Sequence, residues 1–453
     1  MKKILFISIF LTLQTISTFA QNELKAKIEY EEAEKAYTEN NFVDAYAGLI
    51  KTEELIGKWS PNISYLKIKS LDHICDYNDF KNNYTQAQIK EVKLYMAFSN
   101  AHQDAVVMDK FKEVYAVEEK LKQTTLDEQN KTDPDFIAGE KAYEDTSYVI
   151  AMTFYRKAAD KGNGNAMRMI GKLYGSGMGV SQSWPIAIEW YKKAIAHGNI
   201  ESLALMGHRY YYGQGVTRDY VEAMSWYKKA ADKGSTVAMY YIGQLYYYGL
   251  GVAINYTEAL NWYKKAANVG YVDAMFAIGS IYYSGKGVAV NYTEAINWHK
   301  KAAEDGNIDA MYTAGYMYDH GLGVTVNYTE AMNWYKKAAD KGYLAAINSI
   351  GVLYEIGKGV AVNYTEAMDW YKKAADKGNV NAMNNIGNLY YDGKGVAVNY
   401  TEAMNWYKKA ADKGNANAMN KIGNMYYNGI GVKKDKVIAE EWFQKERTAN
   451  ATK

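Results

Sequence analysis

Tryptophan recurs every 36 residues through the last two thirds of this 453-residue chain. No insertion breaks the series, which consists of Trp190, Trp226, Trp262, Trp298, Trp334, Trp370, Trp406 and Trp442. Three series of glycines keep the same interval, and 34 of the 37 glycines lie from Gly162 onward. A fixed period of this length is typical of proteins in which each unit packs on the one before. The chain is therefore predicted to form a tandem array.

Each unit contains the pattern of two helices, as residues 255–290 illustrate. Asn255 is suited to cap the first helix, and Glu258 follows at the spacing of a capping box. Apolar residues then recur at helical spacing up to Gly270, where the helix is expected to end. Nine units carry a good capping residue at the first position: Ser147, Ser183, Asp219, Asn255, Asn291, Asn327, Asn363, Asn399 and Asp435.

The second helix of the unit carries a glycine inside its apolar stripe. Gly279 and its equivalents cost about 1 kcal/mol each in helix propensity relative to alanine. Their recurrence predicts that a neighbouring helix crosses too closely for a side chain. Gly285 and Gly287 are expected to end this helix. The tryptophans also fall on apolar stripes, which favours core packing over a cofactor or base-stacking platform.

The repeated pattern is A-x-x-W-Y-x-K-A-A-x-x-G-x-x-x-A-M-x-x-I-G-x-L-Y-x-x-G-x-G-V, and residues 367–396 match it throughout. This pattern resembles the Sel-one-like repeat family, which is related to the tetratricopeptide repeats. The resemblance implies an all-α, right-handed superhelical solenoid of about nine helix-turn-helix units over residues 136–448, which acts as an adaptor or scaffold. Some cysteine-rich relatives are linked to β-lactam binding or hydrolysis, but this chain has a single cysteine, Cys75.

The residues before the array have other characteristics. Residues 1–20 combine a basic start, an apolar run and small residues before a cut after Ala20, the pattern of a secretory signal peptide. No later apolar stretch approaches the ~20 residues of a membrane span, so no stable membrane insertion is expected after cleavage. Residues 21–135 are predicted to form a helical region with a degenerate tetratricopeptide-like unit, ending in a polar link over 124–135. Residues 449–453 are expected to be a tail.

Composition excludes several classes of function. The 53 basic and 51 acidic residues nearly cancel, which argues against a nucleic-acid binder. The histidines show no metal-ligand spacing, and no catalytic set, metal site or cofactor motif is predicted. The Ser-x-x-Lys pattern of penicillin-binding enzymes occurs at Ser64–Lys67 and Ser225–Lys228, and its short length favours chance. At five of the capping positions, Asn255, Asn291, Asn327, Asn363 and Asn399, the sequence reads Asn-Tyr-Thr, a formal glycosylation site, but capping explains these asparagines better.

Two surfaces are candidates for partner binding. The second helices differ most between units on the face away from the apolar stripe, where Tyr240, Phe276 and Tyr312 occupy equivalent positions and Tyr316 lies nearby. Exposed aromatic residues there would form a recognition strip, and neutral drift on a solvent face explains the variation equally well. The competing surface is the nearly constant polar face of the first helices, represented by Asn261, Lys264, Asn333 and Lys336.

These observations favour an exported, non-enzymatic scaffold that binds a protein or peptide along its surface. Its location would be the periplasm, the cell surface or the medium, and its partner would be found in the cell envelope or outside the cell. Binding of a cell-wall or surface glycan is the alternative, suggested by export and by the many tyrosine and asparagine residues. A β-lactam-directed hydrolase is the least favoured hypothesis.

Overall fold

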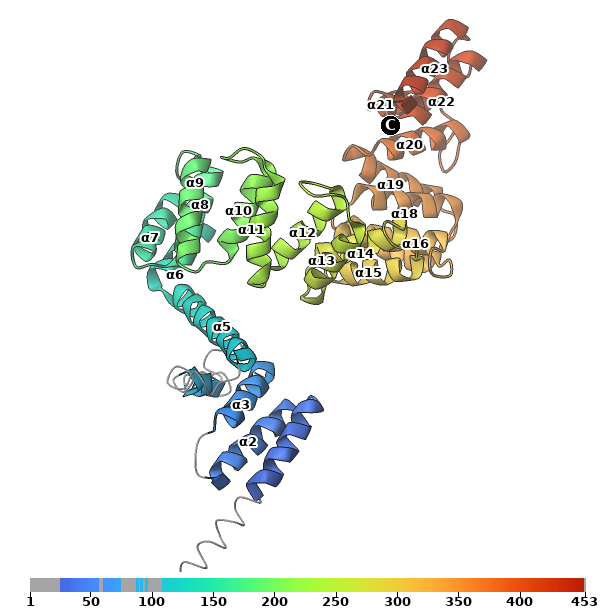
Figure 1. The fold of residues 1–453 in the computed structure, drawn as a ribbon. Coiled ribbons are helices and arrows are strands. Elements are labelled where there is room, and N and C mark those ends of the chain that lie inside the picture. The colour runs from blue at the N-terminus through green and yellow to red at the C-terminus, as the bar shows by residue number, and fades with distance from the viewer. Residues whose placement is uncertain are drawn as a thin grey trace, which may run out of the picture. The chain divides into compact units, whose positions relative to one another are not determined.

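The computed structural model describes residues 25–56, 60–74, 87–88, 90–92, 94–96 and 108–451, and every regular element within these ranges is a helix (Figure 1). The predicted signal peptide and Cys75 lie outside the described residues. The chain forms two compact units, one ending at Ser202 and the other beginning at Leu203. Both consist largely of helix hairpins, so the prediction of an all-α solenoid is confirmed.

The first unit combines the N-terminal helices with the start of the array. Residues 25–38 are helical and are followed by α2 (Phe42–Ile56) and α3 (Pro61–Ile74). The helix α5 (Met108–Thr132) is the longest of the described elements. The array then begins with α6 (Pro134–Glu144), α7 (Tyr148–Asp160), α8 (Gly164–Ser176) and α9 (Trp184–Ala196). The expected polar link over 124–135 is wrong, because α5 continues to Thr132 and Asp133 directly caps α6.

The second unit continues the same alternation of helices with little change in length. Its first hairpins are formed by α10 (Glu201–Tyr212), which starts just before the boundary, α11 (Tyr220–Asp232), α12 (Thr236–Tyr248), α13 (Tyr256–Asn268) and α14 (Val272–Ser284). They are followed by α15 (Tyr292–Glu304), α16 (Ile308–His320), α17 (Tyr328–Asp340), α18 (Leu344–Ile356) and α19 (Tyr364–Asp376). The last helices are α20 (Val380–Asp392), α21 (Tyr400–Ala411), α22 (Ala416–Asn428) and α23 (Lys436–Ala451).

The predicted capping residues start most of the first helices. In α13 the side-chain oxygen of Asn255 accepts a hydrogen bond from the Glu258 N–H at 3.0 Å. The same bond is made from Asp219, Asn291, Asn327, Asn363, Asn399 and Asp435. Ser147 and Ser183 make no side-chain cap hydrogen bond, so the capping prediction is wrong for these two serines.

The backbone of each capping residue ties its hairpin to the previous one. The Asn255 N–H, which a capping box would offer to Glu258, donates instead to the Tyr246 carbonyl at the end of α12, at 2.9 Å. The equivalent bond is made by Ser183, Asp219, Asn291, Asn327, Asn363, Asn399 and Asp435 to a tyrosine carbonyl nine residues earlier. One of the two hydrogen bonds of the predicted capping box is therefore wrong. The N–H of the capping residue does not bond to the glutamate side chain, because it closes the turn between hairpins.

The difference between the caps is measurable. Replacing Asn399 by alanine is expected to cost about 1 kcal/mol, because the Glu402 N–H loses its 3.0 Å acceptor. Replacing Ser183 by alanine is expected to have little effect, because its side chain makes no cap bond. Thermal and urea unfolding of the two variants check this, and equal losses at the two positions would contradict it.

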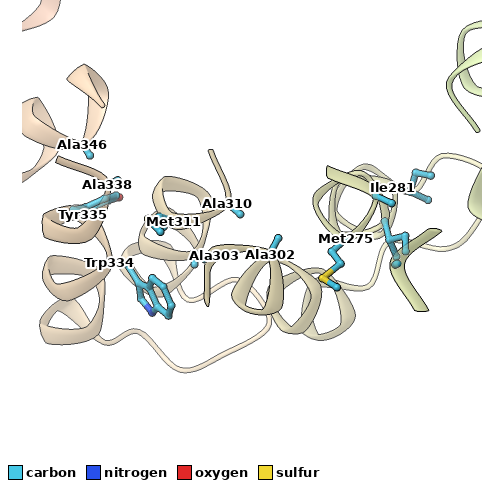
Figure 2. Packing of buried hydrophobic residues seen from close by; sticks show 14 of the residues in the cluster. Met275, Ile281, Ala302, Ala303, Ala310, Met311, Trp334, Tyr335, Ala338 and Ala346 are labelled. Carbon is cyan, nitrogen blue, oxygen red and sulfur yellow. The ribbon is translucent and has the colours of Figure 1, made fainter. Parts of the chain in front are cut away.

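The most extensive contacts of the core lie between the second helix of one hairpin and the first helix of the next. A Cβ placed on Gly351 of α18 would lie 2.6 Å from the Tyr371 ring of α19. The same close approach pairs Gly171 with Tyr191, Gly207 with Tyr227, Gly243 with Tyr263, Gly279 with His299, Gly315 with Tyr335, Gly387 with Tyr407 and Gly423 with Phe443. The predicted close crossing at these glycines is confirmed. Figure 2 shows how Trp334 and Tyr335 of α17 belong to one cluster with small residues such as Ala302.

The tryptophans lie at the edge of this core. Trp334 is buried, with 5% of its surface exposed, and the other seven members of the 36-residue series are half-buried. The residue after each tryptophan lies deeper, as in Tyr335 with 1% exposed. A lysine three residues later covers the ring: Lys337 lies 3.8 Å from the centroid of Trp334, and Lys265 lies 3.9 Å from that of Trp262. The tryptophans thus pack against the core with one side and support a lysine with the other.

Candidate functional site

The predicted aromatic strip lies between hairpins and is only partly accessible. Tyr240, Phe276 and Tyr312 are half-buried, because each ring packs on the first helix of the next hairpin. The ring centroids of Tyr240 and Tyr263 are 5.6 Å apart, and those of Phe276 and His299 are 5.2 Å apart. The expectation of fully exposed rings is wrong, since these aromatic residues contribute to the contact between hairpins. Their outer edges remain part of the second-helix surface.

Burial also changes the chemistry of this strip. Desolvation, with a smaller contribution from the charge of Asp273, raises the pKa of Tyr240 to about 12. Its hydroxyl accepts a hydrogen bond from the Gln244 amide at 2.7 Å. Tyr316 lies on the same surface of α16 and stacks on His320 with ring centroids 4.0 Å apart. Tyr240 therefore offers a neutral ring and hydroxyl at physiological pH.

The polar face of the first helices is more open. Asn261, Asn333 and Lys336 are exposed, and Lys264 is half-buried beside the Tyr282 ring, 5.9 Å from its centroid. A hollow of about 410 Å³ lies over the same face of α15. It is lined by Glu294, Asn297, Trp298, Lys300, Lys301 and Glu304, two of which are the equivalents of Asn261 and Lys264. This face offers amides and charges of both signs.

A second hollow of about 440 Å³ lies on the second-helix surface. It is lined by Tyr247, Ser280, Tyr283, Ser284, His299, Tyr312, Thr313 and Tyr316. The structure thus brings together Tyr312 and Tyr316 of the predicted strip and adds His299 of α15. His299 is 1% exposed, and its Nδ1 atom has no hydrogen-bond partner. Burial lowers the pKa of His299 to about 4, so its imidazole is neutral at pH 7.

The spacing of the histidines in the sequence tests only for a metal site and does not point to His299. A comparison of the residues at the same position in each repeat unit does single out His299. Tyr191, Tyr227, Tyr263, Tyr335, Tyr371 and Tyr407 occupy the equivalent position in other hairpins, with Phe443 in the last. A single histidine at a position otherwise filled by a larger ring indicates a local change in packing.

The half-buried His208 and the buried His299 predict a loss of stability in mild acid. Burial lowers the pKa values of His208 and His299 to about 4, with Arg209 adding to the effect at His208. The unfolded chain therefore binds more protons than the folded chain between about pH 6.5 and pH 4. The free energy of unfolding is expected to fall as pH decreases through this window, by at most about 1.4 kcal/mol per pH unit for each histidine. Urea unfolding from pH 7 to pH 4.5 measures the slope.

Substitution separates this effect from general acid sensitivity. His299→Tyr is expected to flatten the pH dependence, because tyrosine occupies this position in other hairpins and does not titrate in this range. An unchanged slope in the His299→Tyr variant would contradict the assignment.

The Ser-x-x-Lys pattern at Ser64 forms a buried structural network. The Ser64 hydroxyl donates to Glu91 at 2.8 Å, and the Lys67 ammonium donates to Glu53 at 2.6 Å and to Glu91 at 3.2 Å. Burial opposes the charge of Lys67, but the two carboxylates outweigh it and raise the lysine pKa. Ser64 is 0% exposed, so a substrate cannot reach it, and the protonated Lys67 cannot act as its general base. This geometry does not favour hydrolysis.

Within the part of the chain that the structure describes, no group of three or more histidine, cysteine, aspartate and glutamate residues is placed to hold a metal ion. No helix among the same residues is both long and apolar enough to cross a membrane.

Comparison with known proteins extends the repeat assignment to a family. The Sel1 repeat model matches nine segments, at residues 143–163, 164–199, 200–235, 236–271, 272–307, 308–343, 344–379, 380–415 and 416–445. No functionally curated protein matches the chain.

Two solved structures are similar over most of their length. A protective antigen of uropathogenic Escherichia coli strains, which displays an SLR fold, is 25% identical with a TM-score of 0.58, over 97% of this chain and 91% of its own. A Sel1 repeat protein of Oxalobacter formigenes is 30% identical with a TM-score of 0.51, over 66% of this chain and 86% of its own. Because the family model covers most of the array and these relatives share its fold, the chain belongs to the Sel1 repeat family.

Proposed function

We propose that this protein is an exported, non-enzymatic scaffold that binds a protein or peptide along the second-helix surface of its array. Sel1 repeat proteins generally act as protein-interaction scaffolds, and the family is typically non-catalytic. Export is supported by the basic start, the apolar run and the small residues of the first twenty positions.

One observation carries the choice of surface. The hairpins keep an almost constant core, while the second helices vary at half-accessible positions that repeat every 36 residues. Tyr240, Phe276 and Tyr312 occupy such a position in three consecutive hairpins, and Asn348, Asn384 and Asn420 occupy it in the next three, where Asn348 and Asn420 are half-buried and Asn384 is buried. Aromatic and amide side chains on a rigid support are well suited to recognise an extended peptide, because little side-chain entropy is lost on binding.

Site-specific photocrosslinking in intact cells tests the proposal. A photoreactive amino acid is placed at position 420 on the second-helix surface, at 333 on the polar face of a first helix, and at 362 in a connecting turn as the control. The expected result is a discrete protein adduct from position 420 and none from 362. An adduct from 333 alone would move the site to the first helices.

The glycan alternative predicts a different result. Binding to a wall or surface polymer would give co-sedimentation of the purified protein with that polymer and no protein adduct from either helix surface. Residues of the second hollow are left unchanged in this experiment, so that its outcome is independent of that hollow.

A further inference from the structure

We propose that the second hollow, beside His299, is a binding site for one neutral sugar residue. This is the hollow of about 440 Å³ on the second-helix surface, lined by residues of α12, α14, α15 and α16. The inference goes beyond the proposed function, because it adds a sugar site to the surface that binds the protein or peptide. It does not require that a peptide be bound.

Three side chains at the hollow, those of Ser280, Ser284 and His299, are smaller than their equivalents in the two neighbouring hairpins. In the same order, these equivalents are Gln244 and Tyr316, Tyr248 and His320, and Tyr263 and Tyr335. The helices α14 and α15 keep the 13 residues of most other helices of the array. The hollow is therefore associated with shorter side chains on helices of ordinary length.

The change at His299 also removes a contact between helices. In two later hairpins the equivalent tyrosine reaches the second helix of the preceding hairpin with its hydroxyl. Tyr371 donates to Glu355 at 2.7 Å, and Tyr407 donates to Asn388 at 2.8 Å. The imidazole of His299 packs on its glycine as those rings do, but it lacks the outer part of the phenol. The space that a tyrosine hydroxyl would occupy is therefore open to another molecule.

The serine and threonine hydroxyls of the hollow are available as acceptors. Ser280 donates its hydrogen to the Phe276 carbonyl at 3.0 Å, Ser284 donates to the Ser280 carbonyl at 2.8 Å, and Thr313 donates to the Asp309 carbonyl at 2.8 Å. Each of these oxygens keeps lone pairs for a ligand, while its hydrogen is already used.

The tyrosines of the hollow supply donors. Four of them line it, and a phenol hydroxyl donates one hydrogen bond as well as accepting. The oxygen of Tyr247 accepts from the Lys286 ammonium at 3.0 Å, which leaves the phenol hydrogen available to a ligand. The lining thus combines donors with acceptors, and a ligand whose groups do both is matched by it. Alcohol hydroxyls have this property, and a sugar carries several of them on one ring.

The rings of the four tyrosines form walls that are held in place. Each ring packs on a neighbour: Tyr247 on Tyr256, Tyr283 on Tyr292, Tyr312 on Tyr343 and Tyr316 on His320, with centroids 5.3, 5.3, 5.0 and 4.0 Å apart. Such walls lose little side-chain entropy when a ligand binds. The C–H face of a sugar ring packs on aromatic rings, while its hydroxyls reach polar groups. The volume of about 440 Å³ falls within the range of about 300–1,000 Å³ that is usual for ligand pockets.

The charge of the hollow favours a neutral sugar. The residues that line it include no lysine, arginine, aspartate or glutamate, and burial lowers the pKa of His299 to about 4. A charged sugar would lose hydration without gaining an opposite charge in the lining. Lys286 lies beside the hollow, but its ammonium already bonds to the Tyr247 hydroxyl.

The test measures binding of small probes to the full chain by saturation-transfer NMR titration. The sugar probes are methyl β-glucoside, methyl β-galactoside and methyl α-mannoside. The comparison probes are N-acetyl-asparaginamide, a neutral peptide amide, and glucuronate, an anionic sugar. The expected result is at least about tenfold tighter binding of one sugar probe than of either comparison probe. Binding of no sugar probe, or equally tight binding of a comparison probe, would overturn the proposal.

Two variants that refill the hollow locate the site. His299→Tyr and Ser280→Gln introduce side chains that neighbouring hairpins carry at these positions. Both are expected to fold with an undiminished Tm and to lose at least about tenfold in affinity for that sugar probe. Asn424→Gln is the matched control, because Asn424 is the equivalent of Ser280 in α22, and it is expected to bind as the unchanged protein does. Undiminished sugar binding by either refilled variant would reject the site, while a protein adduct from position 420 would still support the scaffold.

Discussion

Replacing Lys67 by alanine is expected to lower the free energy of unfolding of the N-terminal helices by about 3–5 kcal/mol. Lys67 has only 5% of its side chain exposed and bonds to both Glu53 and Glu91. Without the ammonium group, two poorly hydrated carboxylates face each other with no positive charge between them. Removal of one partner from a buried charge network is costly because the remaining charges are left uncompensated.

The same helix supplies the control. Lys69 bonds to Glu113 at 3.0 Å, but their side chains are 24% and 46% exposed. Solvent screens such a pair, so Lys69→Ala is expected to cost about 0–1 kcal/mol. Hydrogen exchange of the α3 amides measures both variants, with α18 amides as an internal reference. If the α3 amides exchanged as slowly in Lys67→Ala as in Lys69→Ala, the buried network would not stabilise this region.

Much of the array could be predicted because each constraint is repeated. Nine capping positions, eight tryptophans and the interval of 36 residues determine the helices, and the recurrence of Gly279 predicted where helices cross. The sequence could not predict which of two adjacent aromatic residues is more deeply buried. Trp262 and Tyr263 both fall within a wide apolar stripe, and only the crossing geometry decides that the tyrosine packs on the glycine of the preceding hairpin.

Contacts between residues that are far apart in the sequence could not be predicted from it. Ser64 and Glu91 are 27 residues apart and belong to no repeat, so their pairing had no sequence signal. Tyr240 was expected on an open face, and its contact with Tyr263 comes from the packing of one hairpin on the next. The sequence shows that His299 is an exception at a position that tyrosine or phenylalanine fills in other hairpins. The hollow beside it could not be predicted, because it depends on how three helices pack.

The contact between Gly351 and Tyr371 predicts strong coupling at the middle of the second unit. Tyr371→Ala is expected to cost about 3–5 kcal/mol, because a ring with 0% exposure is lost together with its bond to Glu355. Gly351→Ala places a Cβ 2.6 Å from that ring, which costs about 1–3 kcal/mol and is offset by about 1 kcal/mol of helix propensity.

The double variant distinguishes a steric clash from a general weakening of the helix. With the ring removed, the new Cβ has room, so Gly351→Ala with Tyr371→Ala is expected to cost less than the two single changes added together. Gly378→Ala is the control: its φ of +94° strains any other residue, but nothing lies within 4 Å of the added Cβ. Urea unfolding should show no coupling between Gly378→Ala and Tyr371→Ala, and equal coupling for both glycines would contradict the steric account.

The position of the pair also determines how the array unfolds. In a solenoid each hairpin contacts only its neighbours, so stability is close to a sum of hairpin and interface contributions. Loss of the Gly351–Tyr371 interface leaves hairpins on both sides that keep their own contacts, and unfolding is expected to separate into two transitions. The equivalent pair of Gly423 and Phe443 lies at the last helix, where Phe443→Ala is expected to release only α23. A single unchanged transition in Tyr371→Ala would mean that cooperativity in this array does not depend on the interfaces between neighbouring hairpins.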